Sequence, residues 1–260
     1  MKTTKILLLT ALLLTALPCC LETEKNSDVL FQTSTINALL EGVYDGNVTF
    51  AELKKHGDFG IGTFNALDGE MIGLSGDFYQ IKSDGGAYPV GDNAKTPFSV
   101  VTFFSADERI TLDEIVNYSM LEKSLDSRFP SKNIFYAIKI EGNFSHIKTR
   151  SVPKQDKPYP KLAVAVENQK IFEFNNVEGT IVGFYTPGYV QGINVPGYHF
   201  HFITKDRSAG GHLLECEMRN LAAEIDYTTD FYLMLPQDGE FYDTDLTAGE
   251  KEKELEKVEK

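Results

Sequence analysis

Residues 197–218 read GYHFHFITKDRSAGGHLLECEM, and this stretch decides how the rest of the chain is interpreted. His199 and His201 alternate with Phe200 and Phe202, which is the period-two pattern of a β-strand with one polar and one apolar face. Side chains two residues apart on a strand point to the same face, about 6.6 Å apart along the chain. Both imidazoles can therefore reach one metal ion at about 2.0–2.1 Å, while the phenyl rings face a core.

A third histidine follows within the same stretch. The intervening KDRSAGG predicts a turn through Gly210 and Gly211, so HFHFIT and HLLECEM are expected to pair as a hairpin. The hairpin returns His212 to the face that carries the first two imidazoles. The sequence therefore predicts a metal site with three histidine ligands on a β-hairpin.

Three neutral imidazoles leave coordination positions free, which indicates a catalytic rather than a closed structural site. Zinc is the expected ion, with other divalent first-row metals as alternatives. A cupin would add a glutamate shortly after its H-x-H, but Thr204, Lys205 and Asp206 occupy those positions here. The other two histidines, His56 and His146, are expected to be ordinary surface or core residues.

The flanking sequence predicts a β-rich α/β fold of the α+β type, with two domains built on mixed sheets and the metal site on the C-terminal one. Strand-like runs separated by glycine-rich turns dominate, and helices are few. Ser34 or Thr35 is expected to cap a helix at INALLEG, and Thr49 a second short helix. A longer helix is predicted from Thr111 to the residue before Pro130.

The domain boundaries follow from composition. Residues 21–150 form the predicted N-terminal domain, and the proline-rich segment 151–161 connects it to a metal-binding domain at 162–248. Residues 249–260 form a charged tail, expected to be a helix or a solvated segment.

The first 20 residues have the pattern of an export signal. Two lysines precede an apolar run of 12 residues beginning at Ile6, which is too short to span a membrane stably. The sequence LPCC that follows is a loose lipobox, in which Cys20 would be acylated. We therefore expect an exported protein, either extracellular, periplasmic or anchored to the membrane as a lipoprotein. Only Cys216 then remains in the mature chain, and its place in an alternating strand predicts a buried structural thiol.

The charge of the chain excludes one class of partner. Its 260 residues contain 25 basic and 38 acidic side chains, for a formal net charge of -13. A nucleic-acid-binding protein needs a basic surface, and no lysine or arginine cluster supplies one. We therefore expect no nucleic-acid partner.

Several segments together resemble the bacterial alpha-acetolactate decarboxylases, over essentially all of the chain from Val29 onward. They are LFQTSTINALLEG, GDFGIGTFNALDGEMI, KTPFSVVTFF, VPKQDKPYP, GTIVGFYTPGY and NVPGYHFHFITKDRSAGGH. The resemblance implies a zinc-dependent, non-oxidative decarboxylation of 2-acetolactate to acetoin, without an organic cofactor. It also implies a two-domain homodimer that pairs through its N-terminal sheet, with a 2-hydroxy-3-keto acid as substrate.

The resemblance also implies a set of site residues. The family's zinc ligands match His199, His201 and His212, and its other site residues match Glu70, Arg150, Thr63 and, in the tail, Glu259 with Glu254 as the fallback.

The chemistry of the substrate agrees with these roles. Loss of carbon dioxide leaves an enediolate, whose charge a divalent ion stabilises as a Lewis acid. Arg150 would hold the carboxylate, and Glu70 or Glu259 would donate the proton that fixes the acetoin stereocentre. Two alternatives stay open: a non-catalytic surface protein that binds a metal or ligand on the same scaffold, and a cupin-like metalloenzyme.

Overall fold

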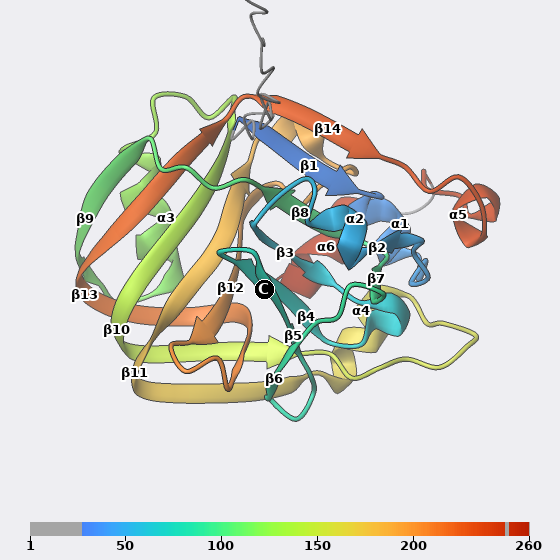
Figure 1. Ribbon diagram of the computed structural model, residues 1–260, viewed down its shortest axis with the longest axis horizontal. Coiled ribbons are helices and arrows are strands. Elements are labelled where there is room, and N and C mark those ends of the chain that lie inside the picture. The colour runs from blue at the N-terminus through green and yellow to red at the C-terminus, as the bar shows by residue number, and fades with distance from the viewer. Residues whose placement is uncertain (1–27, 248–249, 260) are drawn as a thin grey trace, which may run out of the picture.

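Two β-sheets packed against each other carry the fold in the computed structural model, which describes residues 28–247 and 250–259 (Figure 1). The seven-stranded sheet has the order β14 (Asp230–Met234), β1 (Val29–Thr33), β8 (Ser99–Thr102), β3 (Phe59–Thr63), β4 (Glu70–Leu74), β5 (Asp77–Ile81) and β6 (Ala87–Pro89). Its strands pair antiparallel except β1 and β14, which are parallel. The predicted signal segment and Cys20 lie outside the described residues.

The second sheet holds the predicted histidine hairpin. Its strands are β10 (Phe135–Ser151), β11 (Lys170–Thr186), β12 (Gly197–Thr204), β13 (Gly210–Thr228) and β9 (Glu108–Ile115). Because β13 pairs with β12 at its start and with β10 along most of its length, strands β10 to β13 form a closed ring of pairings. The predicted β-rich fold, with the three histidines on a hairpin of the C-terminal sheet, is confirmed.

Short helices pack around these sheets. They are α1 (Ile36–Leu40), α2 (Phe50–Leu53), α3 (Tyr118–Asp126), α4 (Leu162–Ala165), α5 (Glu240–Asp243) and α6 (Lys251–Glu259), and β2 (Val48–Thr49) pairs with β7 (Lys95–Thr96). Three turns of 3₁₀-helix occur at Asn65–Leu67, Val166–Asn168 and Gly188–Val190. The hydroxyl of Thr35 accepts a hydrogen bond from the amide of Ala38, and that of Thr49 from the amide of Glu52, so both predicted caps form. No helix among residues 28–247 and 250–259 is long and apolar enough to cross a bilayer.

The long helix predicted from Thr111 is wrong in its first turns. Residues up to Ile115 form β9 instead, and the helix begins at Tyr118 with Asn117 as its N-cap. Ile110 and Leu112 lie two apart, as a strand requires, and both are buried where β9 pairs with the edge of β13. Pairing between distant strands thus overrides the helical spacing of the apolar residues.

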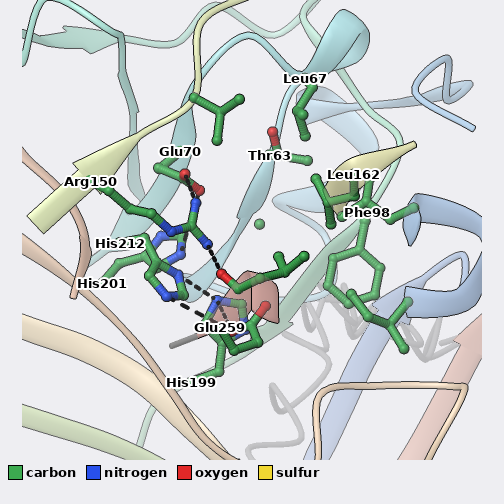
Figure 2. A pocket seen from close by; sticks show the side chains of 15 residues that line it. Thr63, Leu67, Glu70, Phe98, Arg150, Leu162, His199, His201, His212 and Glu259 are labelled. Carbon is green, nitrogen blue, oxygen red and sulfur yellow. Dashed lines mark hydrogen bonds and ion pairs between the residues drawn. The ribbon is translucent and has the colours of Figure 1, made fainter. Parts of the chain in front are cut away.

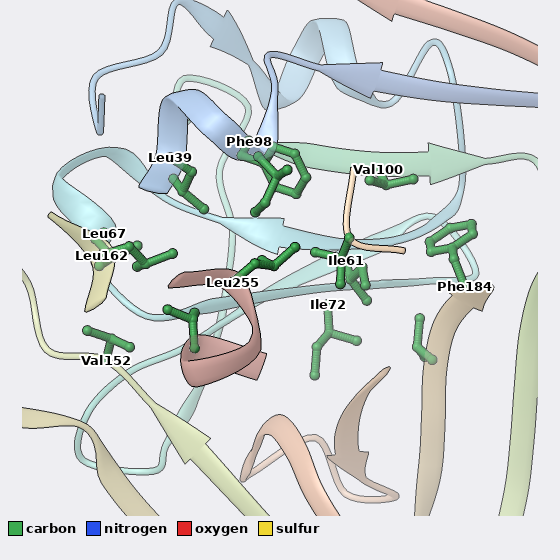
Figure 3. Packing of buried hydrophobic residues seen from close by; sticks show 14 of the residues in the cluster. Leu39, Ile61, Leu67, Ile72, Phe98, Val100, Val152, Leu162, Phe184 and Leu255 are labelled. Carbon is green, nitrogen blue, oxygen red and sulfur yellow. The ribbon is translucent and has the colours of Figure 1, made fainter. Parts of the chain in front are cut away.

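The sheets do not follow the predicted division of the chain at residues 151–161. Strands β9 and β10 precede this segment yet belong to the five-stranded sheet, and β14 follows it yet joins the seven-stranded sheet through β1. The two sheets also share one apolar core, which contains Ile61 and Ile72 from one sheet and Phe184 from the other (Figure 3). Each half of the chain therefore contributes strands to both sheets.

Gly210 and Gly211 belong to β13 rather than to the turn predicted there. A side chain at Gly210 would place its Cβ 2.2 Å from the carbonyl oxygen of Phe202, and one at Gly211 would place it 2.5 Å from that of Arg150. Gly211 also has a φ of 143°, which disfavours other residues. The two glycines let β13 enter between β12 and β10, and this brings the three strands of the site together.

Candidate active site

The register of three strands brings the predicted metal ligands to one place. His201 on β12 lies directly opposite His212 on β13, and His212 lies opposite Arg150 on β10. Residues paired across neighbouring strands point to the same face of a sheet, and His199 shares that face because it lies two residues from His201. Phe200 and Phe202 are fully buried on the other side, as the alternation predicts.

The three imidazoles form a compact cluster. Their ring centroids are 5.0–5.3 Å apart, and one ligand nitrogen from each ring lies within 4.8 Å of the others. The Nε2 of His199 is 3.2 Å from the Nδ1 of His212. The Nδ1 of His201 donates to the carbonyl oxygen of Met71 at 2.8 Å, which fixes the tautomer and leaves Nε2 as the free acceptor.

Burial keeps these rings neutral. Desolvation, with a smaller contribution from the charge of Arg150, lowers the pKa of His199 to about 3. The pKa values of His201 and His212 lie well below the ordinary value, again chiefly because both rings are buried. Neutral imidazole is the form that binds metal ions.

The cluster fits a metal ion on its own chemistry. The Nε2 of His201 is buried and has no hydrogen-bond partner among the described residues. An unpartnered buried acceptor is unfavourable unless a cation or donor compensates it. A divalent ion bound by three nitrogen ligands would satisfy this, and the hydrogen bond from His201 to a backbone carbonyl is the usual way of orienting such a ligand.

An arginine and two glutamates border the histidines. The Nη1 of Arg150 donates to Glu70 at 3.0 Å, and its Nη2 donates to the carbonyl oxygen of Val258 at 3.2 Å. The other carboxylate oxygen of Glu70 is 3.8 Å from the Nε2 of His201. Glu259, the last residue of α6, has a carboxylate oxygen 3.8 Å from the Nε2 atoms of both His199 and His212.

Both carboxyl groups are poised to exchange a proton near neutral pH. Burial raises the pKa of Glu70 to about 7, against the opposing effect of Arg150. Burial also raises the pKa of Glu259 to about 7, again opposed by Arg150. Each group therefore can hold a proton at neutral pH, which an ordinary surface glutamate does not.

These groups surround a cavity of about 40 Å³ (Figure 2). Figure 2 shows the histidines, Arg150 and Glu70 on one side of it, and Leu67, Phe98 and Leu162, together with Thr63, on the other. The Nε of Arg150 is buried and has no hydrogen-bond partner among the described residues. The site thus offers a fixed cation, two carboxyl groups and a metal-binding cluster to one small, partly apolar ligand.

Seven of the eight residues predicted for the site meet at this cavity. Thr63 lies opposite Glu70 on β3 and lines the cavity, but its hydroxyl donates to the carbonyl oxygen of Gly69 at 2.7 Å. Glu254 does not reach the site, since it lies near the other end of α6 and its carboxylate is 3.7 Å from Lys251. The tail is a docked helix rather than a solvated segment, because Leu255 and Val258 are buried.

Sequence reasoning missed two groups of residues. The first group is the backbone carbonyls of Met71 and Val258, which accept hydrogen bonds from His201 and Arg150. Because these contacts are made by the backbone, the residue types at positions 71 and 258 do not reveal them. The second is the apolar wall of the cavity, formed by Ile36, Leu39, Leu67, Phe98, Val152 and Leu162. Nothing in the sequence distinguishes these side chains from other core residues.

Comparison with known proteins gives one consistent result. The sequence profile of the alpha-acetolactate decarboxylase family matches residues 30–248. The alpha-acetolactate decarboxylase of Methanosarcina mazei is 58% identical over 234 residues, covering 90% of this chain and 81% of that protein. The enzyme of the same name from Methylococcus capsulatus is 51% identical and covers 86% of each chain.

The fold agrees with the sequence match. A crystal structure of alpha-acetolactate decarboxylase from Bacillus subtilis superimposes with a TM-score of 0.87 at 44% identity, covering 89% of this chain and 99% of that one.

Proposed function

The chain belongs to the alpha-acetolactate decarboxylase family, and from this premise we propose that it converts 2-acetolactate to acetoin and carbon dioxide. The observation that carries the proposal is the placement of Arg150 and two buried glutamates around the three histidines. A non-catalytic binding protein would need no acid of raised pKa beside a fixed cation.

Arg150 binds the carboxylate of the substrate in this proposal. Its Nη1 is held by Glu70 and its Nη2 by the carbonyl oxygen of Val258, so the guanidinium plane is fixed before substrate arrives. The buried Nε has no partner among the described residues, and it can donate to a carboxylate oxygen. Fixing the carboxylate also orients the carbon–carbon bond that breaks.

Glu259 donates the proton. When carbon dioxide leaves, the electron pair of the broken bond moves toward the neighbouring ketone, and a proton must then reach the carbon. Glu70 is tied to Arg150 as its counter-ion, whereas Glu259 has no hydrogen bond to the guanidinium and a pKa of about 7. A carboxyl group with this pKa is a suitable general acid at neutral pH.

His199, His201 and His212 would hold a divalent ion, for which we propose zinc. Three neutral nitrogen ligands with positions left for substrate are typical of catalytic zinc sites. When bound, such an ion supplies Lewis-acid stabilisation of the negative charge that develops on the substrate oxygens. The apolar wall of the cavity excludes water and suits the alkyl groups of the substrate.

We further propose that the protein is exported, that Cys20 carries the lipid if the exported form is anchored, and that the protein is a homodimer. The support for export is the apolar run after Lys2 and Lys5, and for the dimer it is the family resemblance. Mass spectrometry of the mature N-terminus and the solution mass of the purified protein test these proposals separately.

The reaction itself is tested by assaying acetoin and metal content together. We expect the purified protein with one equivalent of zinc to form acetoin from 2-acetolactate, and His199→Ala to lose both bound metal and activity. His146→Ala is the matched control, because His146 is hydrogen-bonded to Asn175 at the surface, away from the cavity. An active protein without metal would refute the proposal.

A further inference from the structure

Helix α6 is attached to the rest of the molecule at both of its ends. At its start, the ammonium of Lys251 forms an ion pair with the carboxylate of Glu41, and both side chains are nearly buried, with 10% and 13% of their surfaces exposed. At its end, Arg150 donates to the carbonyl oxygen of Val258. Lys161 also contacts Glu41, at 2.9 Å, but it is half-exposed.

The ion pair at the start matters because the helix has few other contacts. Only Leu255 and Val258 are buried among its nine residues. A helix of nine residues rich in charged side chains is not stable in water by itself, so contacts with the core decide whether it forms. The attachment at Lys251 is therefore a substantial part of what keeps α6 in place.

Glu41 itself lies outside the site. It follows α1 as its C-cap and does not line the cavity. Lys251 and Glu259 are the first and last residues of α6, which at 1.5 Å per residue places them about 12 Å apart. Any effect of Glu41 on the reaction must therefore pass through the helix.

Helix α6 also forms a wall between two cavities. Glu252, Leu255, Glu256 and Glu259 line a larger cavity of about 600 Å³ on its outer side. Glu259 is the only described residue that lines both this outer cavity and the inner one. If the helix loosened, the inner cavity would open to the outer one and Glu259 would leave the two imidazoles that it faces.

We propose that Glu41 is a positioning residue for the decarboxylation: by holding Lys251, it docks α6 so that Glu259 stays against His199 and His212. This inference rests on the proposed role of Glu259 as proton donor. Glu41 contributes no atom to the reaction and acts only through the placement of the helix.

The test uses the full-length, zinc-loaded protein and a double-mutant cycle. Since a small displacement of a catalytic group is costly, we expect Glu41→Gln to lower kcat roughly 10- to 100-fold, with KM and zinc content nearly unchanged. Glu259→Gln should lower kcat at least as much, and the double variant E41Q/E259Q should be no slower than E259Q alone. Glu41→Asp keeps the charge and should recover most of the activity.

Hydrogen–deuterium exchange supplies a readout that does not depend on activity. In E41Q the amides of residues 251–259 should exchange faster, while those of β12 keep their protection. Lys251→Gln should have the same effects and leaves Glu41 paired with Lys161, so it remains informative if E41Q folds poorly. Lys161→Gln is the matched control, and it should leave both kcat and the exchange of α6 unchanged.

Two results would overturn the inference. One is unchanged exchange of α6 in both E41Q and K251Q, and the other is a loss of kcat in E41Q that simply multiplies with the loss in E259Q. A fully active E259Q would instead refute the role proposed for Glu259, and faster exchange in E41Q would still show the attachment. The two failures are thus distinguishable.

Discussion

The buried ion pair between Arg150 and Glu70 allows the contributions of Arg150 to stability and to catalysis to be separated by a second substitution. The two side chains are 5% and 9% exposed, and their contact is 3.0 Å. Arg150→Met removes the charge, keeps most of the volume and leaves Glu70 buried without its cation. Breaking a buried pair in this way costs about 3–5 kcal/mol, which for a chain of this size lowers Tm by roughly 6–20 °C.

The cost should depend on pH. Burial raises the pKa of Glu70 to about 7 even with Arg150 present, so without the arginine its pKa lies higher still. An acid whose pKa is higher in the folded than in the unfolded state makes stability fall as pH rises between the two values. The Tm difference between wild type and R150M should therefore be larger at pH 8 than at pH 5.

A second substitution separates the ion pair from catalysis. In R150M/E70Q the buried carboxylate at position 70 that R150M leaves without its partner is gone, so this variant should be more stable than R150M by about 1–3 kcal/mol. Its activity should not recover, because the substrate carboxylate still lacks its charged donor, and kcat/KM should stay roughly 10²–10³-fold below wild type.

Differential scanning fluorimetry at pH 5 and 8 measures the thermal stability of each variant. Acetoin formation measures its activity, and metal analysis measures its zinc content. If the stability lost in R150M/E70Q equalled the sum of the losses in R150M and E70Q, the broken ion pair would not be the cause of the instability of R150M. If R150M lost its zinc, Arg150 would be a support of the histidine cluster rather than a substrate-binding residue.

Two further predictions concern the scaffold. Burial raises the pKa of Asp226 to about 7, so ionisation of Asp226 destabilises the fold as pH rises from about 4 to 7. In urea titrations, Asp226→Asn should therefore reduce the free energy of unfolding lost between pH 5 and 8 by roughly 2 kcal/mol. An unchanged loss in this variant would contradict the prediction. A Cβ on Gly183 would lie 2.1 Å from the carbonyl oxygen of His199, whereas one on Gly188 would meet nothing within 4 Å. Gly183→Ala should therefore shift β12 and weaken zinc binding roughly 10- to 100-fold, measured in competition with a chelator. Gly188→Ala is the control and should leave zinc binding unchanged. Equal zinc affinities in the two variants would show that β12 tolerates the displacement.

The histidine cluster could be predicted because its determinants are local. Alternation of His199 and His201 with phenylalanine sets the face of one strand, and a short connection returns His212 beside them. The structural role of Gly210 and Gly211 was predicted less well. Gly210 and Gly211 resemble turn residues in sequence, but the structure uses them where three strands approach closely, and such an approach is set by pairing with β10.

The division of strands between the sheets could not be predicted for a related reason. The segment around Thr111 contains both the alternation of a strand and the spacing of a helix. Which of them forms depends on whether the edge of β13 is available for pairing, more than 100 residues later in the chain. Parallel pairing of β1 with β14 likewise joins the first strand of the described chain to its last strand.

The tail shows most clearly what sequence leaves undetermined. Glu254 and Glu259 are equivalent acids in a charged segment until the face that docks is known. Burial of Leu255 and Val258 fixes that face, and it places Glu259 at the cavity and Glu254 beside Lys251. Docking depends on Glu41 and on the apolar core, neither of which is near the tail in sequence.

The two buried glutamates have similar pKa values, yet the structure supports them very differently. Glu70 begins a central strand that is paired on both sides, with Thr63 and Ile81 as its neighbours, and its carboxylate is fixed by Arg150. Glu259 ends a short helix with two buried side chains. Arg150 donates a hydrogen bond to Glu70, whereas the carboxylate of Glu259 faces two of the imidazoles and has no hydrogen bond to the guanidinium among the described residues. The difference in support therefore favours Glu70 as the fixed partner of Arg150 and Glu259 as the acid.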